Sequence, residues 1–310
     1  MIITVCLNPA LDKTLFVDGF WVDGVNRVLS TRKDPGGKSV NVAKLVKVLG
    51  GDTLATGIVG GESGEFIRRE LDKMGICHDF VTSEYPTRTN LKINDRLRHT
   101  TTELNEPGAP VTEELLSQVW GKIDSACKAG DTVVISGANP PGMPDDVLAK
   151  WITALNQKGV FTALDTVGMP MKLGVAAKPN LIKPNLNELS ELFGEQLHYQ
   201  RDVIAAARQL VQQGVERVVV SMGAEGALFV TKEHVLHSRG VHVAIGSTVG
   251  SGDAMLAAVV HYLQQGASWK EAAHWSVATA CANAMCEGSA TPTMEQIQDV
   301  YDKVSVNVLL

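Results

Sequence analysis

Short apolar runs alternate with stretches of helical periodicity along most of the 310 residues of the chain. Between Ser39 and Leu49, apolar residues recur on one helical face, and Gly50 follows as a stop signal. The apolar runs have the length of buried strands. The strands predicted in this way are Ile2–Leu7, Leu54–Val59, Thr132–Ser136, Val160–Asp165, Leu181–Lys183 and Arg217–Ser221. Strands that alternate with helices predict an α/β fold with a mostly parallel central sheet covered by helices.

Start signals place several of the helices. A helix is predicted over Glu65–Met74, and Thr112 is a candidate N-cap because two glutamates follow it in the first turn. Two later segments have the spacing of capping boxes, Ser268-x-x-Glu271 and Thr293-x-x-Gln296.

Two stretches interrupt the alternation of strands and helices. Lys13–Thr31 lacks helical periodicity, and Thr87–Leu104 alternates loosely around a predicted turn at Asn94-Asp95. Both are interpreted as β-ribbons, which together would form a small sheet over the carboxyl ends of the main strands, where open α/β sheets bind ligands. We therefore expect a single domain over residues 1–310, with a lid inserted at about residues 13–34 and 87–106.

Composition and charge exclude several classes of protein. Apolar residues make up 45% and charged residues 20% of the chain, which argues against a disordered or fibrous protein. The 28 basic and 34 acidic residues give a net charge of −6, so no broad basic stripe is expected and no nucleic-acid partner is predicted. No charge-free stretch reaches the roughly 20 apolar residues that a membrane span needs.

The start of the chain and its cysteines indicate a compartment. The chain opens directly into an apolar run, without the basic region or cleavage site of a signal peptide. The cysteines contain no C-x-x-C pair, which favours reduced thiols over a disulfide framework. They are Cys6, Cys77, Cys127, Cys281 and Cys286. We expect a cytoplasmic protein without a membrane partner.

Two common nucleotide-binding motifs are absent. Gly37-Lys38-Ser39 ends like a P-loop, but Arg32 stands where that motif needs its first glycine. The dinucleotide-binding fingerprint fails as well, because no third glycine follows Gly252.

A different glycine loop precedes the apolar run Ala254–Leu263. Glycines let backbone amides approach a ligand closely, and the N-terminus of a helix favours an anion. The candidate anion-binding residues are Gly250, Ser251 and Gly252. Asp253 follows them, and the local pattern leaves two interpretations open. It is either a capping or first-turn acid, or a general base that faces a phosphoryl group held by the same amides.

Further segments form an ordered set along the chain. They are Leu7–Asp12, Pro35–Ala43, Lys183–Leu189 and Ser221–Ala227, the last acting with the Gly250–Asp253 loop. Each is moderately specific alone, and their order and spacing make the set far more specific. In these segments the sequence resembles the PfkB-type carbohydrate kinases of the ribokinase superfamily, within the branch that phosphorylates sugar phosphates. The resemblance covers essentially the whole chain and implies a ribokinase-like three-layer α/β sandwich with a small β-sheet lid.

On the nucleotide side, the resemblance implies a kinase that uses ATP and Mg²⁺. Asp253 is the implied base, and the amides of Gly250–Gly252 form the implied anion hole. Glu188 is the implied metal residue, acting through coordinated water as suits Mg²⁺, and its alternative is a solvated acid on a helix. The implied nucleotide-binding residues are Lys183, Asn185, Ser221, Gly223, Gly226 and Ser247.

On the sugar side, the implied substrate-binding residues are Asp12, Gly37, Lys38, Asn41, Ser136 and Gly137. Arg88 and Arg27 fall in the two ribbons, where the sugar-phosphate members place cations that bind phosphate. A planar guanidinium suits this task because it can bind a phosphate through two hydrogen bonds. The alternative for both arginines is a solvated surface position. Lys38 is alternatively an ordinary lysine at a helix start, although a cation there opposes the helix dipole.

The sequence departs from the family's usual pattern at a few positions. Ser39 stands where the family usually has Gly, and Ala254 follows the implied base in place of the common Ser. Ala138 and Asn139 replace the usual Ser-Leu before Pro140. These changes leave Asp253 in place and bear on the sugar specificity.

The implied function is the phosphorylation of a ketohexose phosphate by ATP, with conversion of fructose 1-phosphate to fructose 1,6-bisphosphate as the first expectation. Tagatose 6-phosphate and fructose 6-phosphate are alternatives in the same class. More distant alternatives are an inactive regulator that binds a sugar phosphate, and a kinase of free sugars or nucleosides. A homodimer paired through the lid is also expected, because it would cover the apolar residues Phe16, Phe20 and Trp21.

Overall fold

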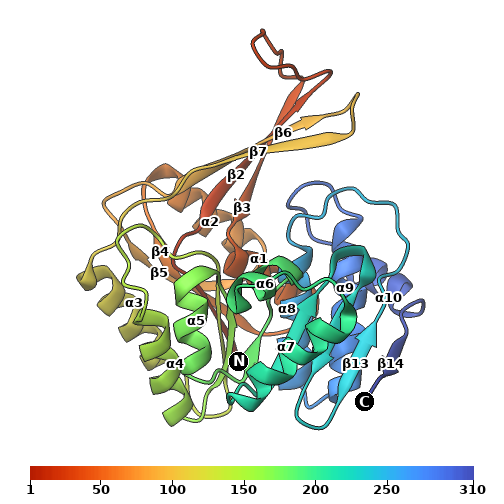
Figure 1. Cartoon of the computed structure of the whole chain (residues 1–310). Helices are drawn as coiled ribbons and strands as arrows, with labels where there is room; N and C mark the ends of the chain where they lie inside the picture. Colours follow the sequence, from red (N-terminus) through yellow and green to blue (C-terminus); the bar gives the residue numbers. More distant parts are fainter.

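Two β-sheets organise the chain in the computed structural model, which describes residues 1–310 (Figure 1). The strands of the larger sheet are β1 (Ile2–Cys6), β4 (Thr53–Val59), β5 (Cys77–Thr82), β8 (Thr132–Ser136), β9 (Phe161–Asp165), β10 (Leu181–Ile182), β11 (Arg217–Ser221), β12 (Ala227–Val230), β13 (Val235–Ser238) and β14 (Val306–Val308). Their order across the sheet is β14-β13-β12-β11-β10-β9-β8-β1-β4-β5. The pairs from β5 to β11 are parallel, and those from β11 to β14 are antiparallel. The predicted mostly parallel sheet is confirmed, with an antiparallel edge that the apolar pattern does not predict.

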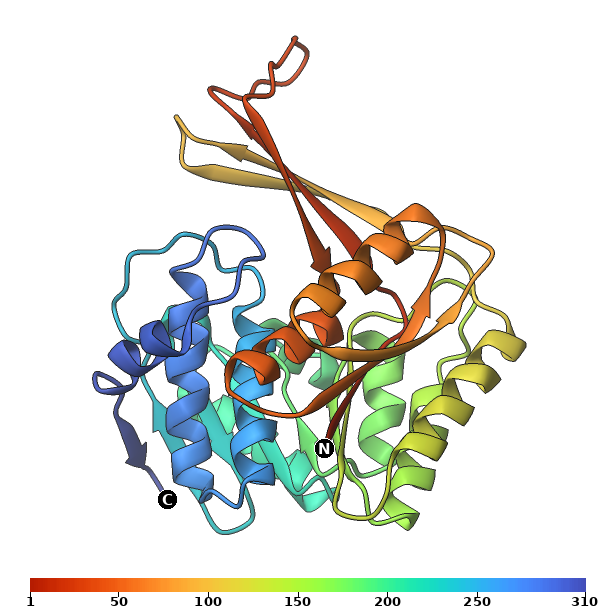
Figure 2. The same cartoon turned by 180° about the vertical axis from the view of Figure 1, so that it is seen from behind.

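Helices cover both faces of the larger sheet and complete three layers. One face is covered by α3 (Glu113–Ala126), α4 (Val147–Gln157), α5 (Gly168–Ala176), α6 (Leu186–Phe193) and α7 (Gln200–Gln212) (Figure 1). The other face is covered by α1 (Lys38–Val48), α2 (Gly61–Lys73), α8 (Ser251–Gln264), α9 (Trp269–Ala284) and α10 (Met294–Tyr301) (Figure 2). No helix combines the length and apolar character needed to cross a membrane.

The packing explains why the strands are continuous apolar runs. Successive side chains of a strand point to opposite faces of a sheet. In β1, Ile3 and Val5 belong to the hydrophobic cluster under α3–α7, whereas Ile2 belongs to the cluster under α1 and α8. Both faces of a covered parallel sheet are buried, so both sets of positions must be apolar.

The predicted helix starts are largely confirmed. The side chain of Thr112 accepts a hydrogen bond from the Leu115 amide at the start of α3, and capping boxes begin α9 and α10 at Ser268 and Thr293. The predicted start of α2 at Glu65 is wrong, because the helix already begins at Gly61. The glycines before Glu65 suggest a loop in the sequence, but in the structure they allow the start of the helix to lie close to a neighbouring segment of backbone. A side chain on the preceding Gly60 would collide with the carbonyl oxygens of the segment 83–85.

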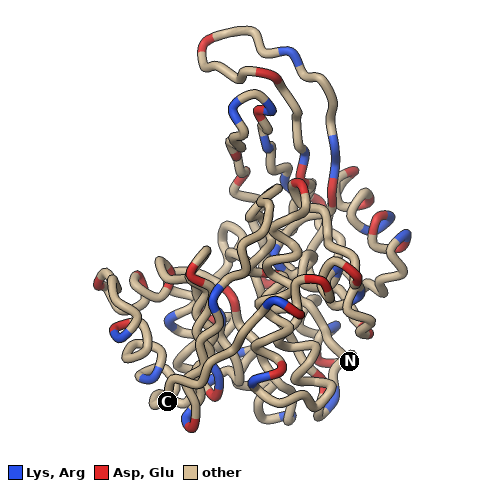
Figure 3. The backbone as a smooth tube through the Cα atoms, turned by 90° about the vertical axis from the view of Figure 1, so that its right-hand side faces the viewer, with Lys and Arg blue, Asp and Glu red and all other residues tan.

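The smaller sheet has four strands and stands away from the main body (Figures 1 and 3). Its strands are β2 (Ala10–Val17), β3 (Ser30–Gly36), β6 (Arg88–Asp95) and β7 (Thr100–Asn105), in the order β3-β2-β6-β7. β2 and β3 form one antiparallel ribbon, β6 and β7 form another, and β2 pairs with β6 in parallel. We call this smaller sheet the lid.

The predicted turn at Asn94-Asp95 is wrong. Both residues lie in the ladder of β6, where they pair with Thr101 and Thr100 of β7, so the chain turns over residues 96–99. The carboxylate of Asp95 accepts hydrogen bonds from amides of this turn and from the amides of Gly19 and Phe20 in the first ribbon. Asp95 therefore links the two ribbons. The sequence does not reveal this link, because Gly19 and Phe20 lie 76 and 75 positions away from Asp95.

Candidate active site

A cavity of about 820 Å³ lies between the lid and the carboxyl ends of the parallel strands. This edge of an open α/β sheet is where ligands bind in such folds. The cavity brings together all but four of the predicted site residues. Those that line it are Asp12, Gly37, Lys38, Asn41, Arg88, Lys183, Asn185, Glu188, Ser221, Gly223, Gly226, Gly250, Ser251, Gly252 and Asp253.

The other four predicted residues do not line the cavity. Ser136 is buried, with its hydroxyl 3.4 Å from the carboxylate of Asp165, and the partly exposed Gly137 follows it. The Ser247 hydroxyl accepts a 3.2 Å hydrogen bond from the Val249 amide and so shapes the loop that leads to Gly250. Arg27 is exposed in the loop between β2 and β3, and a single chain does not bring it to the cavity.

Asp253 lies in the first turn of α8 but does not cap the helix. Gly250 is the N-cap, in a left-handed conformation with φ of 78° that favours glycine, and no side chain caps this end. The Asp253 carboxylate instead accepts a 2.9 Å hydrogen bond from the side-chain amide of Asn41. Burial, with a further contribution from the charge of Asp165, raises the pKa of Asp253 to about 6. A buried carboxylate with a raised pKa beside a glycine loop is suited to accept a proton.

Two lysines converge on Asp165 at the end of β9. The Lys38 ammonium lies 3.2 Å from one carboxylate oxygen, and the Lys183 ammonium lies 3.4 Å from the other. Burial alone would raise the pKa of Asp165, but Lys183 and Lys38 together hold it below its ordinary value. Burial alone would lower the pKa of Lys38, but Asp165 and Glu188 raise it above its ordinary value. The two ammonium groups lie beside the glycine loop, and the raised pKa of Lys38 favours its charged form there, which suits an anionic group.

Asn185 and Glu188 form a capping box at the start of α6. The Asn185 side chain accepts from the Glu188 amide, and one oxygen of the Glu188 carboxylate accepts from the Asn185 amide, both at 2.8 Å. The other carboxylate oxygen of Glu188 lies 3.7 Å from the Lys38 ammonium, in the cavity. No cluster of three or more metal-ligating side chains exists in the chain. A single cavity-facing carboxylate fits Mg²⁺, which keeps most of its waters and binds substrate phosphates.

Asp12 is held by several donors at the lid end of the cavity. It is 4% exposed, and its carboxylate accepts from the Lys92 ammonium and the Ser289 hydroxyl at 2.8 Å and from the Asn90 amide at 3.1 Å. The side-chain oxygen of Asn90 is buried and has no hydrogen-bond partner in the chain. A buried polar atom of this kind requires a partner, and a hydroxyl of a bound sugar would supply one.

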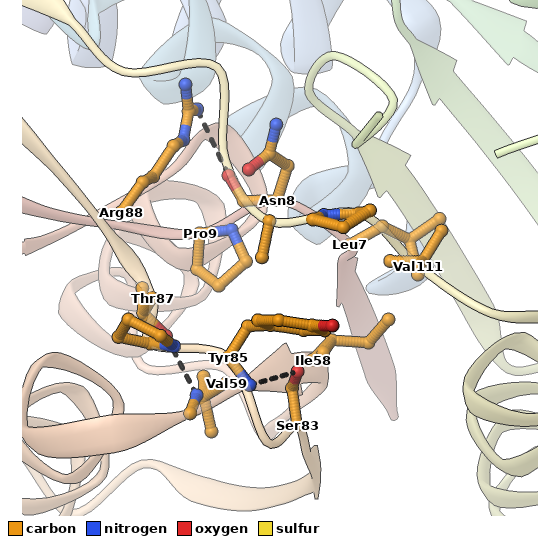
Figure 4. A pocket seen from close by; sticks show the side chains of 14 residues that line it. Leu7, Asn8, Pro9, Ile58, Val59, Ser83, Tyr85, Thr87, Arg88 and Val111 are labelled. Carbon is orange, nitrogen blue, oxygen red and sulfur yellow. Dashed lines mark hydrogen bonds between the residues drawn. The ribbon is translucent and has the colours of Figure 1, made fainter. Parts of the chain in front are cut away.

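Arg88 is fixed by backbone carbonyls at the edge of the same cavity. Its guanidinium donates to the carbonyl of Glu106 at 2.7 Å. It also donates to the carbonyl of Asn8 at 3.1 Å (Figure 4). A second, small cavity of about 30 Å³ lies beside it, between Asn8, Tyr85 and Thr87. The half-buried Arg88 is therefore not a freely solvated surface residue.

Ser39 has a structural role that accounts for one departure from the family pattern. Its side chain is fully buried, donates to the carbonyl of Val5 at 2.6 Å and accepts from the amide of Ser136 at 3.0 Å. The hydroxyl joins the ends of β1 and β8 beneath the cavity, which a glycine would leave without this link.

Several residues of the cavity and its surroundings were not predicted as site residues. Asp165 had a usable signal, because it ends an apolar run at the carboxyl end of a predicted strand. The others gave no such signal, because each depends on a hydrogen bond to a residue 78 or more positions away; they are Lys44, Asn90, Lys92 and Ser289.

The family is shown by comparison with known proteins. The model of the pfkB family carbohydrate kinases matches residues 7–297. The chain belongs to the pfkB family of carbohydrate kinases. This pfkB-family kinase is a phosphotransferase that acts on a sugar hydroxyl, and kinases of the family use ATP as the phosphate donor.

Individual relatives match over nearly their whole length. The 1-phosphofructokinase of Rhodobacter capsulatus is 35% identical, with 99% of this chain and 98% of that protein aligned. The 1-phosphofructokinase of Bacillus subtilis (strain 168) is 32% identical over 100% of both. The crystal structure of phosphofructokinase-2 from Escherichia coli in complex with substrates and products has a TM-score of 0.94 at 30% identity, covering 97% of this chain and 98% of its own. Ribokinase from Thermotoga maritima, at 20% identity, has a TM-score of 0.79 over 97% and 99% of the two chains, which confirms the ribokinase-like fold of this pfkB-family kinase.

Proposed function

We propose that this kinase transfers the γ-phosphoryl group of ATP to fructose 1-phosphate and forms fructose 1,6-bisphosphate and ADP. One observation carries the proposal: a single cavity joins the fixed guanidinium of Arg88 at the lid to Asp253 and the glycine loop at the start of α8. A sugar phosphate needs a cation for its phosphate and a base for its free hydroxyl. Relatives that match the whole chain are 1-phosphofructokinases, which favours this acceptor.

The arrangement supports an in-line transfer. Asp253 accepts the proton of the acceptor hydroxyl, and the oxygen attacks the γ-phosphorus of ATP. The bond between the γ-phosphorus and the β–γ bridging oxygen breaks, and ADP leaves with the electron pair. The amides of Gly250–Gly252 and the ammonium groups of Lys38 and Lys183 stabilise the negative charge on the transferred group. Asp12, which the lid holds in a fixed orientation, accepts hydrogen bonds from sugar hydroxyls and aligns the acceptor.

The polyphosphate of the donor needs a counter-charge in the same cavity. When bound, a magnesium ion supplies this charge neutralisation. We assign Glu188 to it, through coordinated water, because one of its carboxylate oxygens faces the cavity while the other is engaged by the capping box. Asn185 keeps Glu188 in that orientation through the same box.

The overall field of the protein does not attract a sugar phosphate. The net charge is −6, and Lys and Arg are intermixed with Asp and Glu along the backbone (Figure 3). The attraction must therefore come from the few cations at the cavity. Fructose 6-phosphate and tagatose 6-phosphate carry the same phosphate and stay alternatives, and phosphofructokinase-2 from Escherichia coli has been solved in complex with fructose-6-phosphate.

We also propose that residues 1–310 act as one kinase domain whose lid pairs with the lid of a second subunit. The loop between β2 and β3 exposes Trp21 by 58%, Val22 by 84% and Val25 by 83%. Of the residues expected to be covered, Trp21 is exposed, whereas Phe16 and Phe20 are half-buried. Exposed apolar side chains of this kind in one loop favour a partner. Because Arg27 lies in the same loop, a contact between Arg27 and substrate would have to be made across this interface. Location in the cytoplasm stays a prediction.

A panel of acceptors tests the proposed function. ADP release in a coupled assay is measured with fructose 1-phosphate, fructose 6-phosphate, tagatose 6-phosphate and free fructose. We expect the highest kcat/KM with fructose 1-phosphate. A higher kcat/KM with fructose 6-phosphate or tagatose 6-phosphate would show that this other sugar phosphate is the acceptor. ADP release with none of the four compounds would favour an inactive regulator that binds a sugar phosphate.

A further inference from the structure

Lys44 is a buried lysine in the second turn of α1 that forms no ion pair. It is 4% exposed, and its ammonium donates to three oxygen atoms. These are the carbonyl oxygen of Ser289 at 3.0 Å, the side-chain oxygen of Asn41 at 3.3 Å and the carbonyl oxygen of Pro35 at 3.4 Å. Burial lowers its pKa. A buried ammonium without a carboxylate partner costs stability, so a role other than stability has to account for it.

One contact of Lys44 determines how the amide of Asn41 is oriented. The two ends of an asparagine amide have nearly the same shape, so only their hydrogen-bond partners distinguish the oxygen from the nitrogen. An ammonium donates and cannot accept, so the oxygen of Asn41 must face Lys44. The nitrogen of Asn41 then faces the opposite way and donates to Asp253 at 2.9 Å.

A reversed amide would be unfavourable at both ends. Its nitrogen would face the ammonium of Lys44, donor against donor. Its oxygen would face the carboxylate of Asp253, acceptor against acceptor. Lys44 therefore fixes the one orientation in which Asn41 holds the Asp253 carboxylate.

A second contact of Lys44, with Ser289, leads to the proposed sugar end of the cavity. Ser289 accepts from Lys44 through its carbonyl and donates through its hydroxyl to Asp12 at 2.8 Å. The ammonium of Lys92, on lid strand β6, lies 2.8 Å from the same carboxylate and 2.9 Å from the Ser289 hydroxyl. An unbroken series of hydrogen bonds thus runs from the lid to Asp253.

We propose that Lys44 is a positioning residue for Asp253. It fixes the Asn41 amide so that Asp253 is held for proton transfer, and through Ser289 it joins this arrangement to Asp12, the carboxylate at the sugar end. The inference rests on the proposed function of Asp253 as the base. Lys44 does not touch the substrate, so its removal lowers the rate of the chemical step and leaves the binding of both substrates nearly unchanged.

Three variants of α1 test the proposal. Lys44→Met keeps the length of the side chain and removes its donors, Lys44→Arg keeps a cation and its donors, and Lys47→Met is the exposed control one turn along. Loss of one charge-assisted hydrogen bond corresponds to a change of about ten- to a hundredfold in an equilibrium or rate constant. We therefore expect kcat of Lys44→Met to fall by about that factor. Its KM values for fructose 1-phosphate and ATP should change little. Lys44→Arg should recover most of kcat, and Lys47→Met should match the wild type.

A double-mutant cycle distinguishes positioning through Asn41 from a general loss of structure. In an Asn41→Ala background, Lys44→Met should cost little further kcat, because the amide it acts on is already gone. Thermal unfolding is measured for each variant. Should Lys44→Met fail to fold, Lys44→Gln replaces it in the cycle, because it keeps a polar group for the two carbonyls while removing the charge.

The outcomes separate this inference from the proposed function. A wild-type enzyme that phosphorylates no sugar phosphate would overturn the proposed function. With an active wild type, the positioning role is overturned by an unchanged kcat in Lys44→Met, by a loss confined to KM, or by equal losses in the presence and absence of Asn41.

Discussion

The side-chain amide of Asn41 donates a 2.9 Å hydrogen bond to the carboxylate of Asp253, although 212 positions separate the two residues in the chain. Asn41 lies in the first turn of α1 and Asp253 in the first turn of α8, and these two helices pack on the same face of the larger sheet. Both helices begin at the carboxyl edge of the sheet. The contact therefore joins the acid of the glycine loop to the first turn of α1 in the same cavity.

Replacing Asp253 tests its role as the base. Asp253→Asn keeps the shape of the side chain and can still accept from Asn41, but it cannot accept a proton at its oxygen. We expect kcat to fall by at least the roughly 10²–10⁴-fold typical of general acid–base catalysis, while ATP binding and the thermal midpoint are retained. Asp299→Asn, an exposed acid of α10, is the control. Near-normal turnover in Asp253→Asn would show that the carboxylate is not the base.

The pH dependence of the rate should report the same carboxyl group. Because burial and the charge of Asp165 raise the pKa of Asp253 to about 6, the base is protonated and inactive below that pH. The logarithm of kcat/KM should rise as the pH approaches about 6 and level off above it. A phosphate monoester also titrates near pH 6, so the residual activity of Asp253→Asn serves as the reference. If the fall in kcat/KM at low pH were identical in the wild type and in Asp253→Asn, the titrating group would be the substrate phosphate. That result would contradict the assignment of Asp253 as the base.

Replacing Glu188 tests the magnesium assignment. Glu188→Gln keeps an oxygen for the Asn185 amide, so the capping box of α6 is preserved. It removes the charge that faces the cavity. The Mg²⁺ concentration for half-maximal rate should rise, while KM for the sugar phosphate stays nearly unchanged. Glu195→Gln, exposed just after the same helix, is the control. An identical Mg²⁺ titration in wild type and Glu188→Gln would leave Glu188 with its structural role alone.

The sequence predicts those parts of the fold in which both faces of a strand are buried. The parallel strands are such elements, because they show as continuous apolar runs. The edge strands β12, β13 and β14 have three or four residues each and are joined by antiparallel pairing. Such short runs lack a length or periodicity that separates them from loops, so their pairing depends on tertiary contacts.

The residues of the candidate site also divide into those that a local sequence pattern predicts and those that depend on tertiary contacts. Gly250 is predictable from its own segment, because a glycine loop before a helix marks a place where backbone amides can approach an anion. Glu188 entered only through the resemblance to the family, and its capping box with Asn185 became visible in the structure. Lys44, Lys92 and Ser289 are not predictable in this way. The contacts of Ser289 with Lys44 and Lys92 span 245 and 197 positions and exist only after α1, the lid and the segment after α9 have packed.

Substitution in the exposed loop of the lid tests the assembly. Val22→Asp places a charge among the exposed apolar residues Trp21, Val22 and Val25 of this loop, and it should convert a dimer into a monomer. Light scattering at micromolar concentration gives the mass of each form. Tyr199→Ser, which removes another exposed aromatic residue far along the chain, should leave the mass unchanged. A monomeric wild type would exclude pairing through the lid.

Replacing Arg88 tests whether the acceptor already carries a phosphate. A charge-assisted hydrogen bond contributes about 1.5–3 kcal/mol, and every 1.4 kcal/mol is about tenfold in affinity. Arg88→Ala should therefore raise KM for fructose 1-phosphate by roughly ten- to a hundredfold and affect ATP much less. Arg69→Ala, an exposed arginine of α2, should behave as the wild type. Free fructose lacks the phosphate, so it should be a poor substrate whose kinetics hardly respond to the loss of Arg88. Equal kcat/KM for fructose and fructose 1-phosphate in the wild type would instead place this kinase among those that phosphorylate free sugars.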